Sequence, residues 1–200
     1  MHPHIFAYTE NTDSTTIIAE ILSIIDNIPA IVVFLDLENV FKQASPLLIL
    51  ETLSEKGVQG RLIGWIQDYL THRQKLVRFQ GVVSSYKPLE NGTSQEGIPS
   101  PTLFNVLIEN LVKLPFRPSV KLLCYANNLQ LILRGRKRFA NAQHALKLVE
   151  QECNRLGLKL NPAKTRTMAL CSTRLARQDA LHSGNAGNLG RHPPVSWSVV

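Results

Sequence analysis

The sequence contains few cysteines, and their arrangement does not suggest cross-links by disulfide bonds or zinc. The three cysteines, Cys124, Cys153 and Cys171, are far apart, odd in number and set within apolar patterns. These features argue against a disulfide or zinc framework, and they are typical of reduced core residues and an intracellular location, nucleus or cytoplasm. The six histidines show no metal-binding spacing with the cysteines, so a site of that kind is also not predicted.

Long apolar runs are absent as well. No stretch approaches the roughly 20 residues needed to span a bilayer, and residues 1–10 lack the basic-then-apolar layout of a signal peptide. The sequence therefore predicts neither secretion nor a membrane location. Phosphate-loop and serine-hydrolase motifs are missing too, which leaves those catalytic classes without support.

What is present is enough apolar material for one sizeable core and a surplus of positive charge. Hydrophobic residues make up 44% of the 200 residues. The 22 Lys and Arg residues exceed the 15 Asp and Glu residues, giving a net charge of +7. Such a charge favours an anionic partner such as RNA or DNA, and it is equally compatible with ordinary solubility.

Apolar periodicity predicts the order of the elements, and Ser14-Thr15-Thr16 can cap the first helix. In the last long helix the stripe runs from Phe139 to Leu156. We expect helices over residues 15–27, 46–56, 61–70, 101–114 and 139–156, and strands over 31–37, 74–80, 82–88, 120–126, 129–134 and 165–171.

Without the inserted helix and first hairpin, these elements follow the order β-α-β-β-α-β. This is the split arrangement of ferredoxin-like folds, an α+β class in which helices cover one face of a sheet. Residues 173–200 are rich in Ser, Gly, Asn, Arg and Pro and contain few core formers. We expect them to form a disordered tail rather than a second domain.

Asp36 interrupts the apolar first strand and is the first candidate for chemistry. It shares one face with Phe34 and Glu38, because side chains alternate along a strand. A buried carboxylate needs a cation or hydrogen-bond donors, which favours a metal role; a helix-capping Asp after a strand is the alternative. The Asn127-Asn128 pair poses a similar choice, because asparagine tolerates positive φ and suits a two-residue turn without any function.

Four segments in order then carry a resemblance to a known family. They are residues 34–41, 88–105, 125–128 and 157–165, which read FLDLENVF, PLENGTSQEGIPSPTLFN, YANN and GLKLNPAKT. Together, at these separations, they resemble the reverse transcriptase domain of non-LTR (LINE-type) retrotransposons over about residues 12–170. The resemblance implies a polymerase palm over residues 30–172 and a residual fingers helix region over residues 1–29.

The resemblance also implies a reaction and a catalytic site. The family transfers nucleotides with two Mg²⁺ ions, which activate the primer 3′-hydroxyl and stabilise the leaving pyrophosphate. Asp36 matches the first metal-binding aspartate, while Asn127 and Asn128 occupy the positions of the family's paired aspartates. Lys164 matches the lysine expected near the triphosphate; without the resemblance it is simply an exposed charge.

Three further residues match nucleotide- or template-binding positions. Phe41 matches the aromatic residue that excludes a ribose 2′-hydroxyl, although a phenylalanine that only packs its helix is an equal alternative. Gln95 and Gly97 match the loop that holds the template and the incoming nucleotide, where glycine permits a close backbone approach.

Several departures from the family pattern indicate a degenerate fragment. Asn127 and Asn128 remove two formal charges from a site for an ion that prefers anionic oxygen ligands, so Asp36 alone is expected to hold Mg²⁺ weakly. Glu96 stands where the family usually has glycine and adds negative charge beside the nucleotide path. The basic strands of the fingers, a thumb and an endonuclease portion are not visible in the sequence.

The sequence leaves three hypotheses for function and no prediction of oligomeric state. The first is a reverse transcriptase palm fragment, related to RNA-directed DNA polymerases and catalytically inactive. The second is a non-catalytic module that binds RNA or DNA, for which the basic run 134–138 offers phosphate contacts or is only a solvated charge cluster. The third is a transposon fossil without a selected function.

Overall fold

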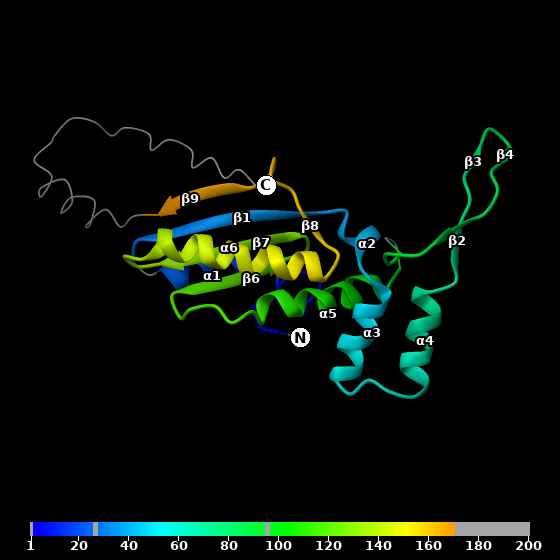
Figure 1. The fold of residues 1–200 in the computed structure, drawn as a ribbon, viewed down its shortest axis with the longest axis horizontal. Coiled ribbons are helices and arrows are strands. Elements are labelled where there is room, and N and C mark those ends of the chain that lie inside the picture. Colours follow the sequence, from blue (N-terminus) through cyan, green and yellow to red (C-terminus); the bar gives the residue numbers. More distant parts are fainter. Residues whose placement is uncertain (1, 26–27, 95–96, 171–200) are drawn as a thin grey trace, which may run out of the picture.

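The computed structural model describes residues 2–25, 28–94 and 97–170, and its centre is an antiparallel sheet of five strands (Figure 1). The long strand β1 lies in the middle. It pairs with the β6–β7 hairpin on one side, and with β8 and β9 in succession on the other. The strands are β1 Ala30–Glu38, β6 Val120–Tyr125, β7 Asn128–Arg134, β8 Lys159–Leu160 and β9 Arg166–Leu170.

Two helices of this unit cover one face of the sheet, which confirms the predicted β-α-β-β-α-β fold. Helices α5 (Ser100–Val112) and α6 (Arg138–Arg155) pack against alternate residues of β1 and β7. The residues of those two strands that enter this larger core are Ile31, Val33, Leu35, Leu37, Leu129, Leu131 and Leu133. The alternation arises because successive side chains of a strand point to opposite faces.

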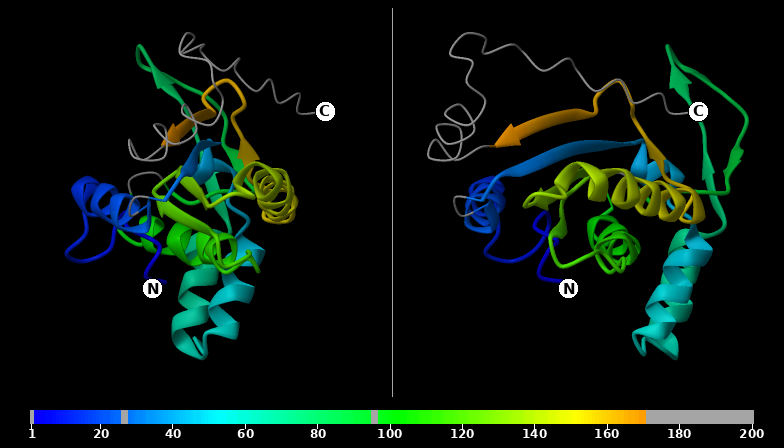
Figure 2. Two further views of the ribbon diagram at one scale, coloured as in Figure 1. Left: turned by 90° about the vertical axis from the view of Figure 1, so that its left-hand side faces the viewer. Right: turned by 60° about the vertical axis from the view of Figure 1, so that its left-hand side comes forward.

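Helix α1 (Ser14–Ile25) precedes this unit and lies on the opposite face of the sheet (Figure 2). Its Ile17 and Ile24 are buried against Val32 and Ile132 in a second, smaller core. The predicted apolar stripe is wider than the contact, because the outward-facing residues of the helix, among them Ile18, remain exposed.

The cap of α1 differs from the predicted Ser14-Thr15-Thr16. Asp13 caps the helix: its Oδ1 accepts hydrogen bonds from the Thr16 amide at 2.8 Å and from the hydroxyls of Thr15 and Thr16 at 2.7 Å. These hydrogen bonds, with that from Thr15 foremost, lower the pKa of Asp13 to about 2.

A helical pair and a projecting two-stranded arm are inserted between β1 and α5 (Figure 1). The short helix α2 (Val40–Gln43), which the sequence did not predict, leads to α3 (Pro46–Glu55) and α4 (Arg61–Leu70). The predicted start of α3 is confirmed, because the Ser45 hydroxyl accepts a hydrogen bond from the Leu48 amide. The arm is divided into β2 Arg73–Lys75, β3 Arg78–Phe79, β4 Val82–Val83 and β5 Lys87–Leu89, where the sequence predicted two continuous strands.

The long helix α6 and the cysteines largely follow the sequence prediction. Ala142, Val149 and Cys153 of the stripe are buried, but Phe139 at its start is 60% exposed and lies under the Arg138 guanidinium. Cys124 and Cys153 are buried free thiols, as predicted. Burial raises the pKa of Cys153 to about 12 and raises that of Cys124 as well, which makes both unreactive. Cys171 and the predicted tail over 173–200 lie outside the described residues.

The first residues of the chain are tied to the outer edge of the sheet. The Phe6 amide donates to the Cys124 carbonyl, and the Cys124 amide donates to the His4 carbonyl, both at 2.9 Å. Ile5 is buried in the larger core and Phe6 in the smaller one. None of the described helices is long and apolar enough to cross a membrane.

Candidate active site

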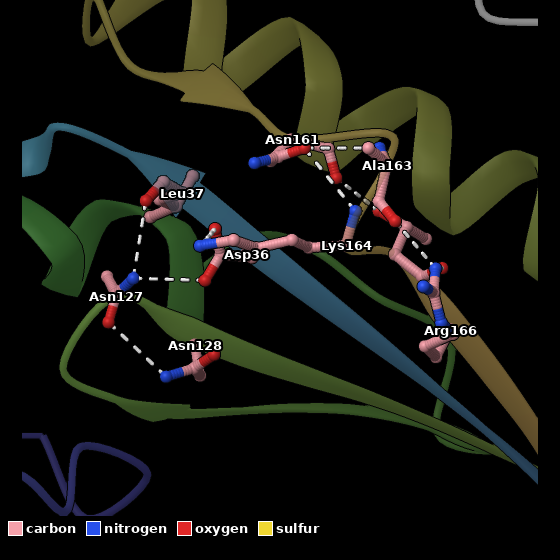
Figure 3. Close-up of polar contacts among 9 residues, drawn as sticks. Asp36, Leu37, Asn127, Asn128, Asn161, Ala163, Lys164 and Arg166 are labelled. Atoms are coloured by element: carbon pink, nitrogen blue, oxygen red, sulfur yellow. Dashed lines mark hydrogen bonds and ion pairs between the residues drawn. The ribbon is translucent and has the colours of Figure 1, made fainter.

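The end of β1 and the β6–β7 turn place Asp36 beside both asparagines. Strand register sets Asp36 directly opposite Asn128, the first residue of β7. Asn127 lies in the turn and its Nδ2 donates to Asp36 Oδ1 at 3.1 Å, while Asn128 Nδ2 donates to Asn127 Oδ1 at 3.3 Å (Figure 3). The motif spacing therefore brings these three side chains to one end of the sheet.

Backbone hydrogen bonds hold this arrangement. The Leu37 amide donates to the Asn127 carbonyl at 2.9 Å, so the turn is fastened to the end of β1. On the other side of β1, the Asn161 amide donates to the Asp36 carbonyl at 2.8 Å. Because these hydrogen bonds join main-chain atoms only, they hold the turn and the loop beside Asp36 whichever side chains these residues carry.

The conformation of the turn does not explain the two asparagines. Tyr125 pairs with Asn128, so the two turn residues are Ala126 and Asn127. The residue with positive φ is Ala126, at 52°, whereas neither Asn127 nor Asn128 is among the positive-φ residues of the described chain. The special tolerance of asparagine for this conformation is therefore not used here.

Asp36 is not a helix cap either. Its carboxylate accepts from the Asn127 side chain and lies 3.4 Å from the Lys164 ammonium, and in the described chain it receives no hydrogen bond from the start of α2. The residue before α2 is Asn39, whose side chain makes no capping bond. Asp36 therefore lies at an open pocket and does not cap α2.

Lys164 reaches Asp36 from the loop between β8 and β9 (Figure 3). Asn161 orders this loop, because its Oδ1 accepts hydrogen bonds from the amides of Ala163 and Lys164 at 3.1 and 3.3 Å. The lysine side chain is 66% exposed, so the ion pair is a weak one. Sequence analysis did not assign Asn161, although an asparagine followed by proline is a recognisable turn signal.

Phe41 and Gly97, which were also matched to the family, do not line this pocket. Phe41 is half-buried on α2 and packs against Phe104 of α5, with ring centroids 5.3 Å apart. These contacts are those expected of a phenylalanine that packs its helix. Gly97 lies just before α5, where an added Cβ would overlap the Tyr69 hydroxyl. Gln95 and Glu96 lie outside the described residues.

The pocket around Asp36 has a volume of about 330 Å³ and a polar lining. It is formed by Asp36, Leu37, Glu38, Asn39, Asn127, Asn161 and Lys164. Within the described chain no three His, Cys, Asp or Glu side chains come together. Both carboxylate oxygens of Asp36 face nitrogen groups, an amide and an ammonium, whereas Mg²⁺ requires several hard oxygen ligands. This donor set does not fit a pair of Mg²⁺ ions.

Comparison with known proteins identifies the family. The family model described as reverse transcriptase (RNA-dependent DNA polymerase) matches residues 3–192. The chain belongs to the reverse transcriptase family. Members of the reverse transcriptase family generally use divalent metal ions.

Solved structures confirm the fold of this reverse transcriptase chain. Telomerase from Candida tropicalis, truncated from the C-terminal domain, aligns with a TM-score of 0.65 and 12% identity over 84% of this chain and 36% of the telomerase chain. The same telomerase in complex with a TWJ fragment of telomeric RNA aligns with a TM-score of 0.68 and 11% identity, over 84% of this chain and 30% of the telomerase chain. The corresponding complex of Candida albicans telomerase aligns with a TM-score of 0.60 and 11% identity, over 85% of this chain and 32% of the telomerase chain. These identities show the palm fold alone, and this chain spans about a third of each telomerase chain. No curated protein matches the sequence.

Proposed function

We propose that this chain is a reverse transcriptase palm of non-LTR retrotransposon origin that no longer adds nucleotides. The observation that supports loss of activity is the environment of Asp36, whose carboxylate contacts the Asn127 amide and the Lys164 ammonium. In this proposal Asn127 and Asn128 are degenerate metal-binding positions. Lys164, Phe41, Gln95 and Gly97 keep only the places of nucleotide- and template-binding residues.

The electrostatic deficit is large enough to matter. At 4 Å and an effective dielectric of 20, two unit charges interact by roughly 4 kcal/mol. Two lost carboxylates therefore weaken a divalent-ion site by orders of magnitude, even if only part of that energy is lost. Glu96 adds a negative charge where a triphosphate is expected, which acts in the same direction.

Primer extension tests this proposal directly. The full chain is incubated with an RNA template, an annealed DNA primer, deoxynucleotides and Mg²⁺, and extension is followed over time. We expect no product above the no-enzyme control. Robust Mg²⁺-dependent synthesis by the unaltered chain would refute the loss of activity.

A division of the chain accompanies this function. We propose that residues 1–29 correspond to a remnant of the fingers, residues 30–172 to the palm and residues 173–200 to a tail.

A second candidate function is binding of RNA or DNA without chemistry. The net charge of +7 and the exposed Arg136 and Lys137 at the end of the β6–β7 hairpin favour it. Two of the structurally similar telomerases are complexes with a fragment of telomeric RNA. Affinity for an oligonucleotide should then fall steeply with salt, because phosphate contacts release counterions. Absence of binding at low salt would eliminate this candidate.

A further inference from the structure

The β2–β5 arm, residues 73–89, is the most exposed part of the described chain. It projects from α4 away from the sheet (Figure 1), and every residue from 74 to 88 is exposed. The side chains of Val77, Phe79, Val82 and Tyr86 are 64 to 72% exposed, although all are apolar or aromatic. A two-stranded ribbon has no core of its own, so these side chains are available to a partner.

The charge of the arm points to a polyanion as that partner. Between residues 71 and 89 there are Arg73, Lys75, Arg78 and Lys87, and no Asp or Glu. Arg73 is used internally, since its guanidinium donates to the carbonyls of Leu70, Asn91 and Gly92. The other three basic residues of the arm form no ion pair within the described residues.

The register of the arm places two of its basic residues side by side on neighbouring strands. Lys75 lies directly opposite Lys87 in the β2–β5 pair. Like charges in this position destabilise a ribbon, because their side chains share one face a few ångströms apart. A phosphate group bound by both ammonium groups would convert this repulsion into attraction.

The aromatic residues of the arm complement these charges. Phe79 is paired with Val82 at the tip, and Tyr86 immediately precedes Lys87 on the return strand. Exposed rings alternating with cations are the elements with which proteins hold single-stranded nucleic acid, by stacking on bases and pairing with phosphates. A duplex keeps its bases stacked internally and would leave the rings without a role.

We infer that the arm is a binding site for single-stranded RNA or DNA, in which Phe79 and Tyr86 stack on bases and Lys75, Arg78 and Lys87 contact phosphates. The site is separate from the Asp36 pocket and does not require catalysis. The inference gives the second candidate function a location and rests on that function, so its experiment must separate the arm from other basic surfaces.

Fluorescence anisotropy with a labelled oligouridylate of about 12 nucleotides, an oligothymidylate of equal length and a duplex of the same length provides the test. We expect the full chain to bind both single strands more tightly than the duplex. The Phe79→Leu/Tyr86→Leu variant keeps apolar side chains but loses the rings, and should bind at least about tenfold more weakly. The Lys75→Gln/Lys87→Gln variant should reduce the slope of log affinity against log salt by about 1.

The variant Arg136→Gln/Lys137→Gln removes the same charge from the competing basic run, residues 134–138, outside the arm. If the arm holds the oligonucleotide, this variant should bind less than about threefold more weakly than the unaltered chain. A greater loss in this variant than in the arm variants would place binding at residues 134–138, which overturns the arm but keeps nucleic-acid binding. No binding at low salt would overturn both, whereas primer extension tests the catalytic proposal independently.

Two further outcomes would also overturn the inference. If the leucine variant binds oligonucleotides as tightly as the unaltered chain, the rings do not stack on bases. If instead Phe79→Ala/Tyr86→Ala converts a larger assembly into monomers in sedimentation, the exposed side chains of the arm are an interface between protein chains. Circular dichroism of each variant should match that of the unaltered chain, because every substituted residue is exposed.

Discussion

At the scale of single residues, Asp36 shows how a few atoms decide the character of a site. Its Oδ1 accepts from the Asn127 amide and its Oδ2 lies near the Lys164 ammonium, so both carboxylate oxygens face nitrogen groups. The backbone bonds that position the turn do not depend on these side chains. The scaffold of the pocket therefore persists independently of its charge.

If Asn127 and Asn128 are degenerate metal-binding positions, as proposed, aspartates there should raise the affinity of the pocket for Mg²⁺. We expect Asn127→Asp/Asn128→Asp to lower the dissociation constant for Mg²⁺ by at least about tenfold. Tenfold requires only about 1.4 kcal/mol, a third of the roughly 4 kcal/mol that one unit-charge pair contributes at 4 Å. Isothermal titration calorimetry measures the change. Adding Glu96→Gly would test whether the negative charge there also opposes nucleotide binding.

The control for this experiment is Gln143→Glu/Gln151→Glu. Both glutamines are exposed on α6, which lies on the face of the sheet opposite to Asp36, so this variant adds the same charge elsewhere. An equal gain in Mg²⁺ affinity would show that net charge alone attracts the ion. Unchanged affinity in the double aspartate variant would show that the turn does not complete a metal site with Asp36.

Glu109 of α5 is a buried carboxylate, with 8% of its side chain exposed. Burial by itself raises the pKa of Glu109, but hydrogen bonds from Lys113 and Lys56, at 2.8 and 2.7 Å, outweigh it and leave the pKa lowered. A carboxyl group with a lowered pKa in the folded state stabilises the protein above its ordinary pKa and loses that contribution as pH falls through the lowered value. Stability should therefore decline on acidification below about pH 5.

The variant Glu109→Gln isolates this contribution. We expect it to lower the free energy of unfolding by about 1 to 2 kcal/mol at pH 7, a modest cost because both lysines reach solvent. Between about pH 5 and pH 3 its stability should fall less than that of the unaltered chain. Urea unfolding at each pH measures both effects. The exposed Glu51 of α3 serves as control, and an equal response of Glu51→Gln would contradict the role of the buried pair.

The sequence could predict which residues lie close together where motif spacing and strand pairing both determine their places. Asp36 lies near the end of the predicted strand 31–37, and Asn127 lies in the turn between the predicted strands 120–126 and 129–134. The two meet because β1 pairs with β7. The surroundings of Phe41 and the capping role of Asp13 were not predictable, because they depend on which neighbour the folded chain presents. The roles matched to Gln95, Gly97 and Lys164 stay predictions.

At the scale of elements, long periodic segments could be predicted and short ones could not. Helices α4, α5 and α6 and the β6–β7 hairpin agree with the expected ranges within about two residues, because many apolar side chains repeat along each. The two-residue strands β3, β4 and β8 have no comparable repeat. Sequence also could not tell that α1 packs on the opposite face of the sheet from α6, since an amphipathic stripe does not specify its partner.

The loop between the arm and α5 depends on one glycine. Gly92 has φ of 91°, and a Cβ there would lie 2.5 Å from the Phe41 carbonyl oxygen and 2.8 Å from Lys42 Cα. Gly92→Ala should lower the free energy of unfolding by about 2 to 4 kcal/mol, from backbone strain together with overlap against backbone atoms that cannot move aside. Denaturant unfolding measures the loss.

Gly81, at the tip of the arm, separates the two causes. Its φ is 81°, but a Cβ there would meet nothing within 4 Å. Gly81→Ala should therefore cost only the strain, about 1 kcal/mol. Equal costs at the two glycines would show that the backbone of α2 moves aside for a Cβ at position 92, and that the overlap adds no cost to the strain.

In helix α4, replacing a glycine by alanine should stabilise the protein. Gly64 lies inside the helix with φ outside the positive range, and a Cβ there would meet nothing within 4 Å. Because glycine loses more backbone entropy than alanine on entering a helix, Gly64→Ala should raise the free energy of unfolding by about 0.5 to 1 kcal/mol. Thermal unfolding followed by circular dichroism would detect a higher midpoint, and a lower one would contradict this account of α4.

At the scale of the whole molecule, one sheet supports two cores, and the start of the chain joins both. Ile5 enters the larger core and Phe6 the smaller one, while the backbone of residues 4–6 pairs with β6 at the edge of the sheet. An unpaired edge strand would otherwise offer its amides and carbonyls to other chains. The N-terminal segment therefore bears on the stability of the palm as well as on the region before it.

Removing residues 1–28 tests whether the palm folds without the segment that precedes it. The truncation deletes α1 and uncovers Val32, Leu123 and Ile132, each 0% exposed in the full chain. We expect loss of cooperative unfolding and concentration-dependent aggregation, measured by denaturant titration and light scattering, because a buried sheet face and an edge strand both become exposed. Phe6→Ala in the full chain should cost about 3 to 5 kcal/mol, whereas Tyr8→Ala, at a site 53% exposed, should change stability by less than about 1 kcal/mol. A truncated chain that unfolds cooperatively at the same midpoint as the full chain would show that residues 1–28 are a separate remnant and that the second core does not stabilise the palm.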